Sequence, residues 1–513
     1  MSSWDSGYVS DIGYTYGYYS ELNPLRSQFA LLNNGIVAPE FETACELGFG
    51  QGLSTNFHAA ASKTEWFGTD FNPSQASLAQ HLNRVSQAGA RLYDEAFEDF
   101  CYRTDLPEFD FIGLHGIWSW ISDKNRMILV DFIGRKLKVG GLLYISYNTL
   151  PGWAAFTPMQ HLMTEHANRM SAPDQSIQNR VGSAIDFADR LLSSSPLYSK
   201  RNPSVKNHLD KIKGMAREYL AHEYFNRDWH PMHFGTFSKL IEPAKVQFAC
   251  SANYLDHVDE VNVTKEQLKF INSVQDPLFR QSIRDFMVDR QFRKDYWIKG
   301  IRRYSNLEKR QVFKDHEIVL QSAVSDVPDK ITGSLGGAVL TPEIYGPVID
   351  TLGNFKSVSI GQLFEQVKNK NIDLTMLAQV IMVLMSDGRV STAQSPEIVN
   401  KVKSETTRLN NHIIERSVGQ SDINYLVSPL TSTAIAVDRI EQLFLRAFKE
   451  GYNQPQDWVS YVWKILKNQG HSIVKDGKSV ESEEESLEVL QELTTKFDKE
   501  RLSLFKGLGV IDY

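Results

Sequence analysis

The chain has 513 residues, a formal net charge of −7 and 42% hydrophobic residues. This length exceeds what one hydrophobic core supports and predicts two to four domains, while the negative charge argues against a general nucleic-acid-binding role. The apolar runs are far shorter than the roughly 18 residues of a membrane helix, and the first residues do not resemble a signal peptide. The three cysteines show no CxxC spacing, so we expect reduced thiols, a cytoplasmic location and no metal site.

An acidic residue and three alternating glycines follow the first predicted strand. The apolar run from Thr43 ends at Glu46, and the glycines Gly48, Gly50 and Gly52 precede a predicted helix that starts at Leu53. A second short apolar run, residues 66–69, ends in Asp70. Glycines let the backbone approach a ligand closely, and a carboxylate at a strand end can accept hydrogen bonds from both ribose hydroxyls. The pattern therefore predicts a cofactor that contains a nucleoside.

The glycine spacing indicates which cofactor this is. A dinucleotide fingerprint needs its third glycine five residues after the first, and that position is Leu53. The pattern resembles instead motif I of the class I S-adenosylmethionine-dependent methyltransferases. In that family the first acid helps to hold the ammonium group of the cofactor and the second holds the ribose, and Glu46 and Asp70 match these positions. The alternative is a nucleotide-type fold that has lost its ligand.

The alternation of strands and helices continues beyond Asp70. Asn72 and Pro73 are typical of a helix start, and this helix is expected to run to residue 82. The segment from Asp94 to Phe97 resembles the acidic segment of the family that meets the adenine, with Glu95 near the amine and Phe97 against the base. Alternatively, Asp94 and Glu95 only open an acidic helix.

A loop at residues 115–120 follows the buried strand predicted over residues 109–114. Ligands of open parallel sheets lie at the carboxyl ends of the strands, so this loop should lie near the transferred methyl group. A helix over residues 123–137 and a strand over 142–147 follow. We expect Trp118 and Tyr147 in an aromatic acceptor channel, and His115 either as a general base or as a structural residue.

The second half of the chain carries weaker signals. Residues 280–310 contain ten Lys/Arg and four Asp/Glu, which fits either a docking surface for an acidic protein or a membrane, or a solvated helix. Apolar residues at helical spacing from Leu374 to Met385 predict a helix in a winged-helix-like module. Residues 341–400 carry a net charge of −2, so we favour contact with protein over DNA.

Several blocks together resemble the bacterial methyltransferases that carry a methyltransferase regulatory domain. The blocks are residues 16–24, 46–52, 68–73, 115–120, 146–153 and 222–231. The characterised members that this chain resembles methylate lysine side chains of outer-membrane proteins. The resemblance implies that Glu46, Gly48, Asp70 and Glu95 line the cofactor site, and that Tyr16 and its neighbours cover it as a lid.

We therefore predict an α/β fold, in which a class I methyltransferase (Rossmann-like) domain precedes mainly helical α+β regulatory and winged-helix-like C-terminal domains. The expected units are an aromatic N-terminal lid (1–24), the methyltransferase domain (25–170), a helical linker (171–215), the regulatory domain (216–305), the winged-helix-like module (306–400) and a C-terminal helical region (401–513).

The predicted function is transfer of methyl groups from S-adenosyl-L-methionine to lysine side chains of a protein, possibly an outer-membrane or surface protein. One alternative is a methyltransferase for oxygen atoms of a small molecule or glycan, which would need a base such as His115. Another is a cofactor-binding interaction protein without activity. A homodimer is possible, and nucleic acid is not an expected partner. The sequence leaves open the acceptor residue, the number of methyl groups and the role of the regulatory domain.

Overall fold

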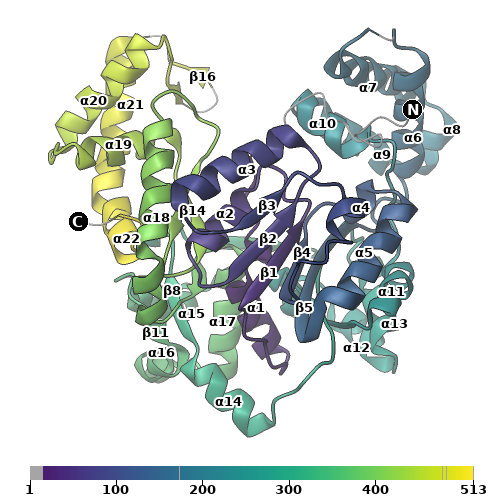
Figure 1. Ribbon diagram of the computed structural model, residues 1–513, viewed down its shortest axis with the longest axis horizontal. Helices are drawn as coiled ribbons and strands as arrows, with labels where there is room; N and C mark the ends of the chain where they lie inside the picture. The colour runs from purple at the N-terminus through teal and green to yellow at the C-terminus, as the bar shows by residue number, and fades with distance from the viewer. Residues whose placement is uncertain (1–15, 173, 476–477, 481, 512–513) are drawn as a thin grey trace.

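The computed structural model describes residues 16–172, 174–475, 478–480 and 482–511. Its centre is a seven-stranded sheet with the strand order β3-β2-β1-β4-β5-β7-β6 (Figure 1). All neighbouring strands pair in parallel except β7, which is antiparallel to β5 and β6. The strands are β1 (Thr43–Leu47), β2 (Glu65–Thr69), β3 (Arg91–Tyr93), β4 (Phe109–Leu114), β5 (Leu137–Asn148), β6 (Gln247–Ser251) and β7 (Phe292–Ile298). This sheet confirms the predicted Rossmann-like α/β fold.

Successive residues of the strands face two different hydrophobic cores, because side chains alternate along a strand. On β4, for example, Phe111 belongs to one core and Ile112 to the other. Helices α1 (Pro24–Asn33), α2 (Leu53–Ala60) and α3 (Pro73–Ser86) contribute to the first core. Helices α4 (Phe97–Phe100), α5 (Asp123–Lys136) and α11 (Phe234–Ile241) contribute to the second.

The helix starts expected around the second strand are found. The Asn72 side chain accepts a hydrogen bond from the Ser74 backbone N–H at 3.0 Å, and Pro73 is the first residue of α3. Ser122 caps α5 in the same way, by accepting from the Asn125 backbone N–H at 3.3 Å. Such caps satisfy backbone donors that the helix itself leaves free.

The sheet takes its last two strands from far along the chain. Strands β6 and β7 lie within the predicted regulatory segment, together with α12 (Lys265–Ser273) and α13 (Pro277–Met287). The segments 25–170 and 216–305, expected as successive units, therefore share one sheet. Five helices between β5 and α11 surround a third core, at the upper right of Figure 1. They are α6 (Thr157–Arg169), α7 (Ile177–Ser193), α8 (Leu197–Arg201), α9 (Ser204–Lys213) and α10 (Arg217–Tyr224).

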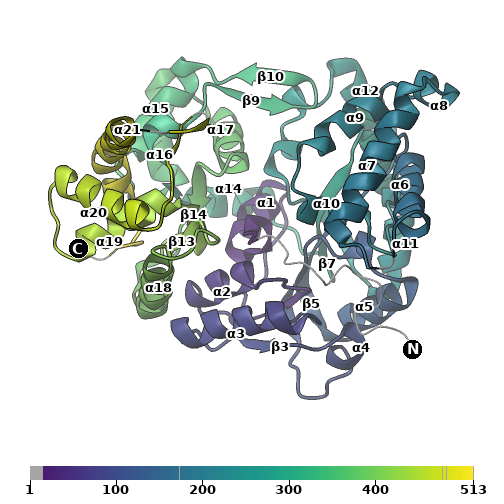
Figure 2. The same ribbon diagram turned by 90° about the horizontal axis from the view of Figure 1, so that it is seen from above.

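The C-terminal part packs beside α1, α2 and α3 and shares their core (Figure 2). Its first portion holds a three-stranded sheet of order β11-β8-β12 and a β9–β10 hairpin. The elements are α14 (Asn306–Asp315), β8 (Glu317–Leu320), β9 (Lys330–Gly333), β10 (Gly336–Val339), α15 (Pro342–Leu352), β11 (Val358–Ser359), α16 (Ile360–Val367), α17 (Leu374–Ser386) and β12 (Val390–Thr392). Helix α17 matches the helix expected from the apolar spacing, whereas the winged-helix identity of this portion stays a prediction.

The final portion consists of helices and two short hairpins. Its elements are α18 (Pro396–Arg416), β13 (Tyr425–Ser428), β14 (Thr433–Ala436), α19 (Arg439–Lys449), α20 (Pro455–Asn468), β15 (Val474–Lys475), β16 (Lys478–Ser479), α21 (Glu483–Lys496) and α22 (Leu502–Gly507). Hydrogen bonds fix it to the first half of the chain: the Asn23 side chain donates to the Ser432 carbonyl at 2.8 Å, and the Gln394 side chain donates to the Ala61 carbonyl at 2.7 Å. Across the described residues, no helix is both long and apolar enough to traverse a bilayer.

Candidate functional site

A cavity lies at the carboxyl ends of β1, β2 and β4, which is the edge of a parallel sheet where ligands commonly bind. Residues from the glycine loop, from the end of β2 and from the loop after β4 form its wall. The lining residues are Gly17, Tyr19, Glu46, Gly48, Phe49, Gly50, Gln51, Asp70, Phe71, Gln75, Phe97, His115, Gly116, Ile117, Trp120 and Ile121. The cavity thus brings together six of the eleven site residues expected from the sequence, and these six are spread over 70 positions, from Glu46 to His115.

The three motif glycines are needed for three different reasons. All have positive φ, at 78° for Gly48, 58° for Gly50 and 71° for Gly52. A Cβ on Gly48 would lie 2.4 Å from the Ile117 side chain, whereas a Cβ on Gly50 would meet nothing closer than 3.9 Å and would occupy the cavity. Gly52 lies outside the lining residues, and its Cβ would lie 2.4 Å from Ala79 on α3. Gly52 therefore serves the packing of α2 on α3, not the cavity that we expected it to line.

The two motif acids are both buried and both line the cavity. Asp70 accepts hydrogen bonds from the Gly50 backbone N–H at 2.8 Å and the Asn72 backbone N–H at 3.0 Å. Burial outweighs these bonds and raises the pKa of Asp70 to about 6. Burial likewise raises the pKa of Glu46 to about 8, although Glu46 accepts a hydrogen bond from the Thr55 hydroxyl. A cation bound beside Glu46 would lower its pKa again and favour the ionised carboxylate.

Two expected cofactor residues lie beside the cavity and do not line it. The Glu95 carboxylate is held by Arg103 at 2.6 Å, and Phe97 faces the cavity in its place. The Tyr16 hydroxyl is hydrogen-bonded to Asp422 and Arg416 of the C-terminal part, and its neighbours Gly17 and Tyr19 line the wall. The rest of the aromatic lid segment, residues 1–15, lies outside the described residues.

His115 lines the cavity as a neutral side chain. Its ring stacks on Tyr19 with centroids 3.7 Å apart, and its Nδ1 lies 2.7 Å from the Tyr144 hydroxyl. Burial lowers the pKa of His115 to about 3. A group with this pKa is a weak proton acceptor near pH 7.

Trp118 and Tyr147 do not reach the cavity, which corrects their assignment to an acceptor channel. Both are fully buried in the second core, where both rings pack on Phe237 of α11. The Tyr147 hydroxyl donates to the Asp295 carboxylate at 3.2 Å, and Arg293 binds the same carboxylate at 2.8 Å. These residues therefore hold the β5–β7 pair together. Tyr144, whose side chain points to the opposite face of β5, reaches His115 instead.

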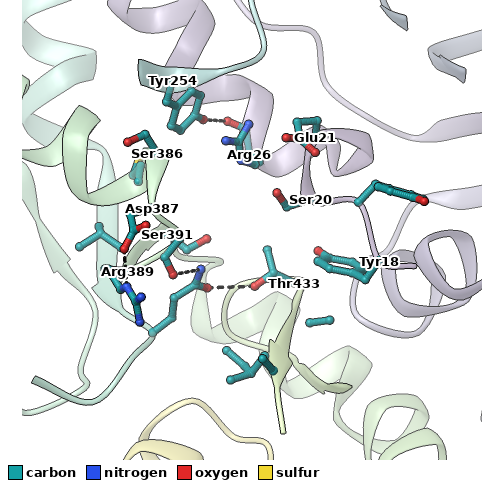
Figure 3. Close-up of a pocket in the computed structure, with 18 of the residues that line it drawn as sticks. Tyr18, Ser20, Glu21, Arg26, Tyr254, Ser386, Asp387, Arg389, Ser391 and Thr433 are labelled. Atoms are coloured by element: carbon teal, nitrogen blue, oxygen red, sulfur yellow. Dashed lines mark hydrogen bonds and ion pairs between the residues drawn. The ribbon is translucent and has the colours of Figure 1, made fainter. Parts of the chain in front are cut away.

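A second cavity, of about 650 Å³, lies between the first half of the chain and the C-terminal part. Figure 3 shows polar side chains from both parts around it, among them Glu21 and Arg26 on one side and Asp387 and Arg389 on the other. Tyr19 lines both cavities, so the Tyr19–His115 ring pair lies where the two meet. Tyr19 belongs to the lid expected over residues 1–24, but the sequence does not indicate that it lines a second cavity.

Glu21 is a charged group in the wall of the second cavity. Its side chain is 13% exposed and forms an ion pair with Lys294 of β7 at 2.6 Å. Burial opposes its ionisation, but the nearby cations Lys294 and Arg26 lower the pKa of Glu21 to about 2. Glu21 is therefore an anion at neutral pH. Glu21 lies in the expected lid segment (1–24), but the sequence does not indicate its pairing with Lys294.

The strand order and the glycine loop with its two buried carboxylates define the class of this fold as that of the class I methyltransferases. The model of the "Predicted methyltransferase regulatory domain" family matches residues 216–299. PKMT2 from Rickettsia typhi, solved in complex with AdoHcy, superposes with a TM-score of 0.68 over 96% of this chain and 99% of its own, at 16% identity.

The curated relatives place the chain within a family. The Synechocystis protein sll1526 is 37% identical over 99% of this chain and 100% of its own length. The chain belongs to the family of that protein. The Rickettsia prowazekii protein RP789 is 27% identical over 54% of this chain and 49% of its own length. These findings confirm the predicted family resemblance and fold class.

Proposed function

We propose that this protein is an S-adenosylmethionine-dependent methyltransferase that acts on lysine side chains of a protein substrate. The observation that carries the proposal is the placement of Glu46, the glycine loop and Asp70 around one cavity at the strand ends. The open position at Gly50 offers room for a ligand against the backbone. The residues present fit the cofactor: Asp70 can accept from the ribose hydroxyls, and Glu46 can pair with the ammonium group.

The bound cofactor would supply an electrophilic methyl group, so the protein has mainly to bind, orient and exclude water. An acceptor lysine must lose a proton first, which costs about 4 to 5 kcal/mol at pH 7 from a reference pKa of about 10.4. Aromatic and apolar side chains such as Trp120, Phe97 and Ile121 line the cavity, and a site poor in water disfavours the ammonium form. The cavity wall thus suits an amine that reacts as the neutral base.

The state of His115 supports an amine acceptor over an oxygen acceptor. Methylation of a hydroxyl requires a general base whose pKa lies near the working pH. His115 is neutral with a pKa of about 3, and it is the one histidine among the described residues that line the cavity. The two carboxyl groups in the wall, Glu46 and Asp70, have a pKa of about 8 and about 6, but this proposal assigns them to the cofactor. A small-molecule or glycan O-methyltransferase is therefore the less supported alternative.

We propose that the acceptor side chain arrives through the second cavity, between the first half of the chain and the C-terminal part. This cavity shares Tyr19 with the first one, and its wall carries the anionic Glu21. Glu21 is paired with Lys294 at 2.6 Å and the wall carries charges of both signs, so the shared residue Tyr19, and not a net charge, supports this route. Passage to the methyl donor requires Tyr19 and His115 to separate. This proposal also includes a substrate located in the outer membrane or at the surface, a cytoplasmic enzyme and a homodimer. These parts rest on the family resemblance.

A pair of glycine variants tests the cofactor site. Gly50→Val places a branched side chain in the cavity, whereas Gly89→Val imposes similar strain at a positive φ of 78° in open space on the α3–β3 loop. By calorimetry with S-adenosylhomocysteine, we expect Gly50→Val to lose binding and Gly89→Val to keep it. If circular dichroism shows that both variants are folded and both bind S-adenosylhomocysteine equally well, the glycine loop does not form the cofactor site.

A further inference from the structure

An open apolar groove lies on the far side of β7 from the second cavity. It has a volume of about 1310 Å³ and lies between α11, α13 and the start of β6. Its floor includes Phe248 and Trp297, whose rings pack at 5.5 Å. Because side chains alternate along β7, Trp297 points to the opposite face from Lys294, which lines the second cavity. The groove is therefore separate from the proposed catalytic site.

The helix α13 presents its apolar residues to solvent and its charged residues to the protein. Phe279 is 57% exposed and Phe286 is 64% exposed. On the inner side, Asp285 is buried against Arg293 at 2.6 Å, and Arg284 binds Asp259 at 2.5 Å. The ion pairs fix this orientation of the helix, so the exposed apolar residues do not result from a loosely held segment.

The apolar groove has a positively charged rim. Lys239, Lys245 and Arg303 lie along it, and in the described part of the chain none of them has a carboxylate within ion-pair distance. The rim also contains two carboxylates, Glu242 and Asp276, so three cations face two anions and the formal net charge of the rim is +1. The Asp276 carboxylate accepts hydrogen bonds from the Leu278 and Phe279 backbone N–H groups at the start of α13. The helix N-terminus thereby offsets its charge.

We propose that this groove binds an acidic, amphipathic segment of a partner protein. Its apolar side chains would enter between α11 and α13, and its carboxylates would meet Lys239, Lys245 and Arg303. A concave groove between two helices suits an inserted peptide better than a flat bilayer surface. The Trp297 indole N–H is buried in this wall and finds no acceptor among the residues that the structure describes, so the packing here leaves a polar group unsatisfied.

Selection of peptides from a random phage-displayed library on the full-length protein tests the proposal. We expect enriched peptides to combine apolar residues with Asp or Glu, and to lose at least about tenfold in affinity for Phe279→Asp. Leu307→Asp is the matched control, because Leu307 is 80% exposed and lies outside the groove. It should bind the peptides as the parent does.

Reversal of the charge of the rim should reverse the charge of the peptides that are selected. The double variant Lys239→Glu, Lys245→Glu should reject the acidic peptides and select basic ones. Failure to enrich any peptide that depends on Phe279, or enrichment without acidic residues, would overturn the proposal. The proposal would also be overturned if the protein self-associates and Phe279→Asp abolishes this association, because a second copy would then occupy the groove. Binding to phosphatidylglycerol vesicles that depends on Phe279 would overturn it as well. None of these readouts requires methyl transfer, so they stand apart from the test of the catalytic function.

Discussion

At the scale of single residues, the proposed cofactor site depends on two buried carboxylates with different roles, Asp70 for the ribose and Glu46 for the ammonium group. Asp70 is already oriented by the Gly50 and Asn72 backbone N–H groups, so it can bind ribose without rearrangement. Asp70→Ala should weaken binding of S-adenosylhomocysteine by about 1 to 3 kcal/mol, because two ribose hydroxyls lose their acceptor. Isothermal titration calorimetry measures this loss. An unchanged affinity in a folded Asp70→Ala protein would show that the ribose lies elsewhere.

Glu46 should make cofactor binding depend on pH. Its pKa of about 8 in the free protein leaves it mostly protonated at pH 7, whereas a bound ammonium group would favour the carboxylate. Binding should therefore release a proton, and affinity should rise as the pH increases towards 8. Calorimetry at pH 7 in buffers of different ionisation enthalpy detects the proton, and Glu46→Gln should remove this contribution. If cofactor binding releases no more protons from the parent protein than from Glu46→Gln, the Glu46 carboxyl is not protonated in the free protein.

At the scale of elements, the pairing of β5 with β7 places Tyr147 in the second core, where it lines neither cavity. Tyr147→Phe removes one buried hydrogen bond to the Asp295 carboxylate and leaves Arg293 bound to it. We expect a loss of about 1 to 3 kcal/mol in the free energy of unfolding, measured with denaturant, and methyl transfer unchanged per folded molecule. A large fall in turnover with unchanged stability would return Tyr147 to the active site.

The sequence could predict the elements around the first two strands because their signals are local. The glycine loop, the Asn72 cap and the acid after β2 all act within a few residues of their own position. The face of a strand was not predictable in the same way. A strand buried on both faces has an almost continuous apolar sequence, so nothing distinguished Tyr144, which reaches His115, from Tyr147, which does not. Pairing across a long separation, such as that of Glu21 with Lys294, also left no pattern in the sequence.

At the scale of the whole molecule, the active region depends on segments from three parts of the chain. Residues before β1 supply Tyr19 and Glu21, the regulatory segment supplies β7 with Lys294, and the C-terminal part closes the second cavity with residues such as Arg389 and Thr433. One continuous hydrophobic core joins the sheet to the C-terminal part. The auxiliary segments therefore shape the route to the proposed methyl donor, which is consistent with a large acceptor.

The most direct test of the central claim is to incubate the purified protein with methyl-labelled S-adenosylmethionine and a bacterial lysate, and then to map the label by mass spectrometry. Gly50→Val serves as the inactive control and Gly89→Val as the active one. The account predicts label on lysine side chains of a few proteins, present with the parent and Gly89→Val and absent with Gly50→Val. Label confined to small molecules or to oxygen atoms, or equal labelling by Gly50→Val, would contradict it.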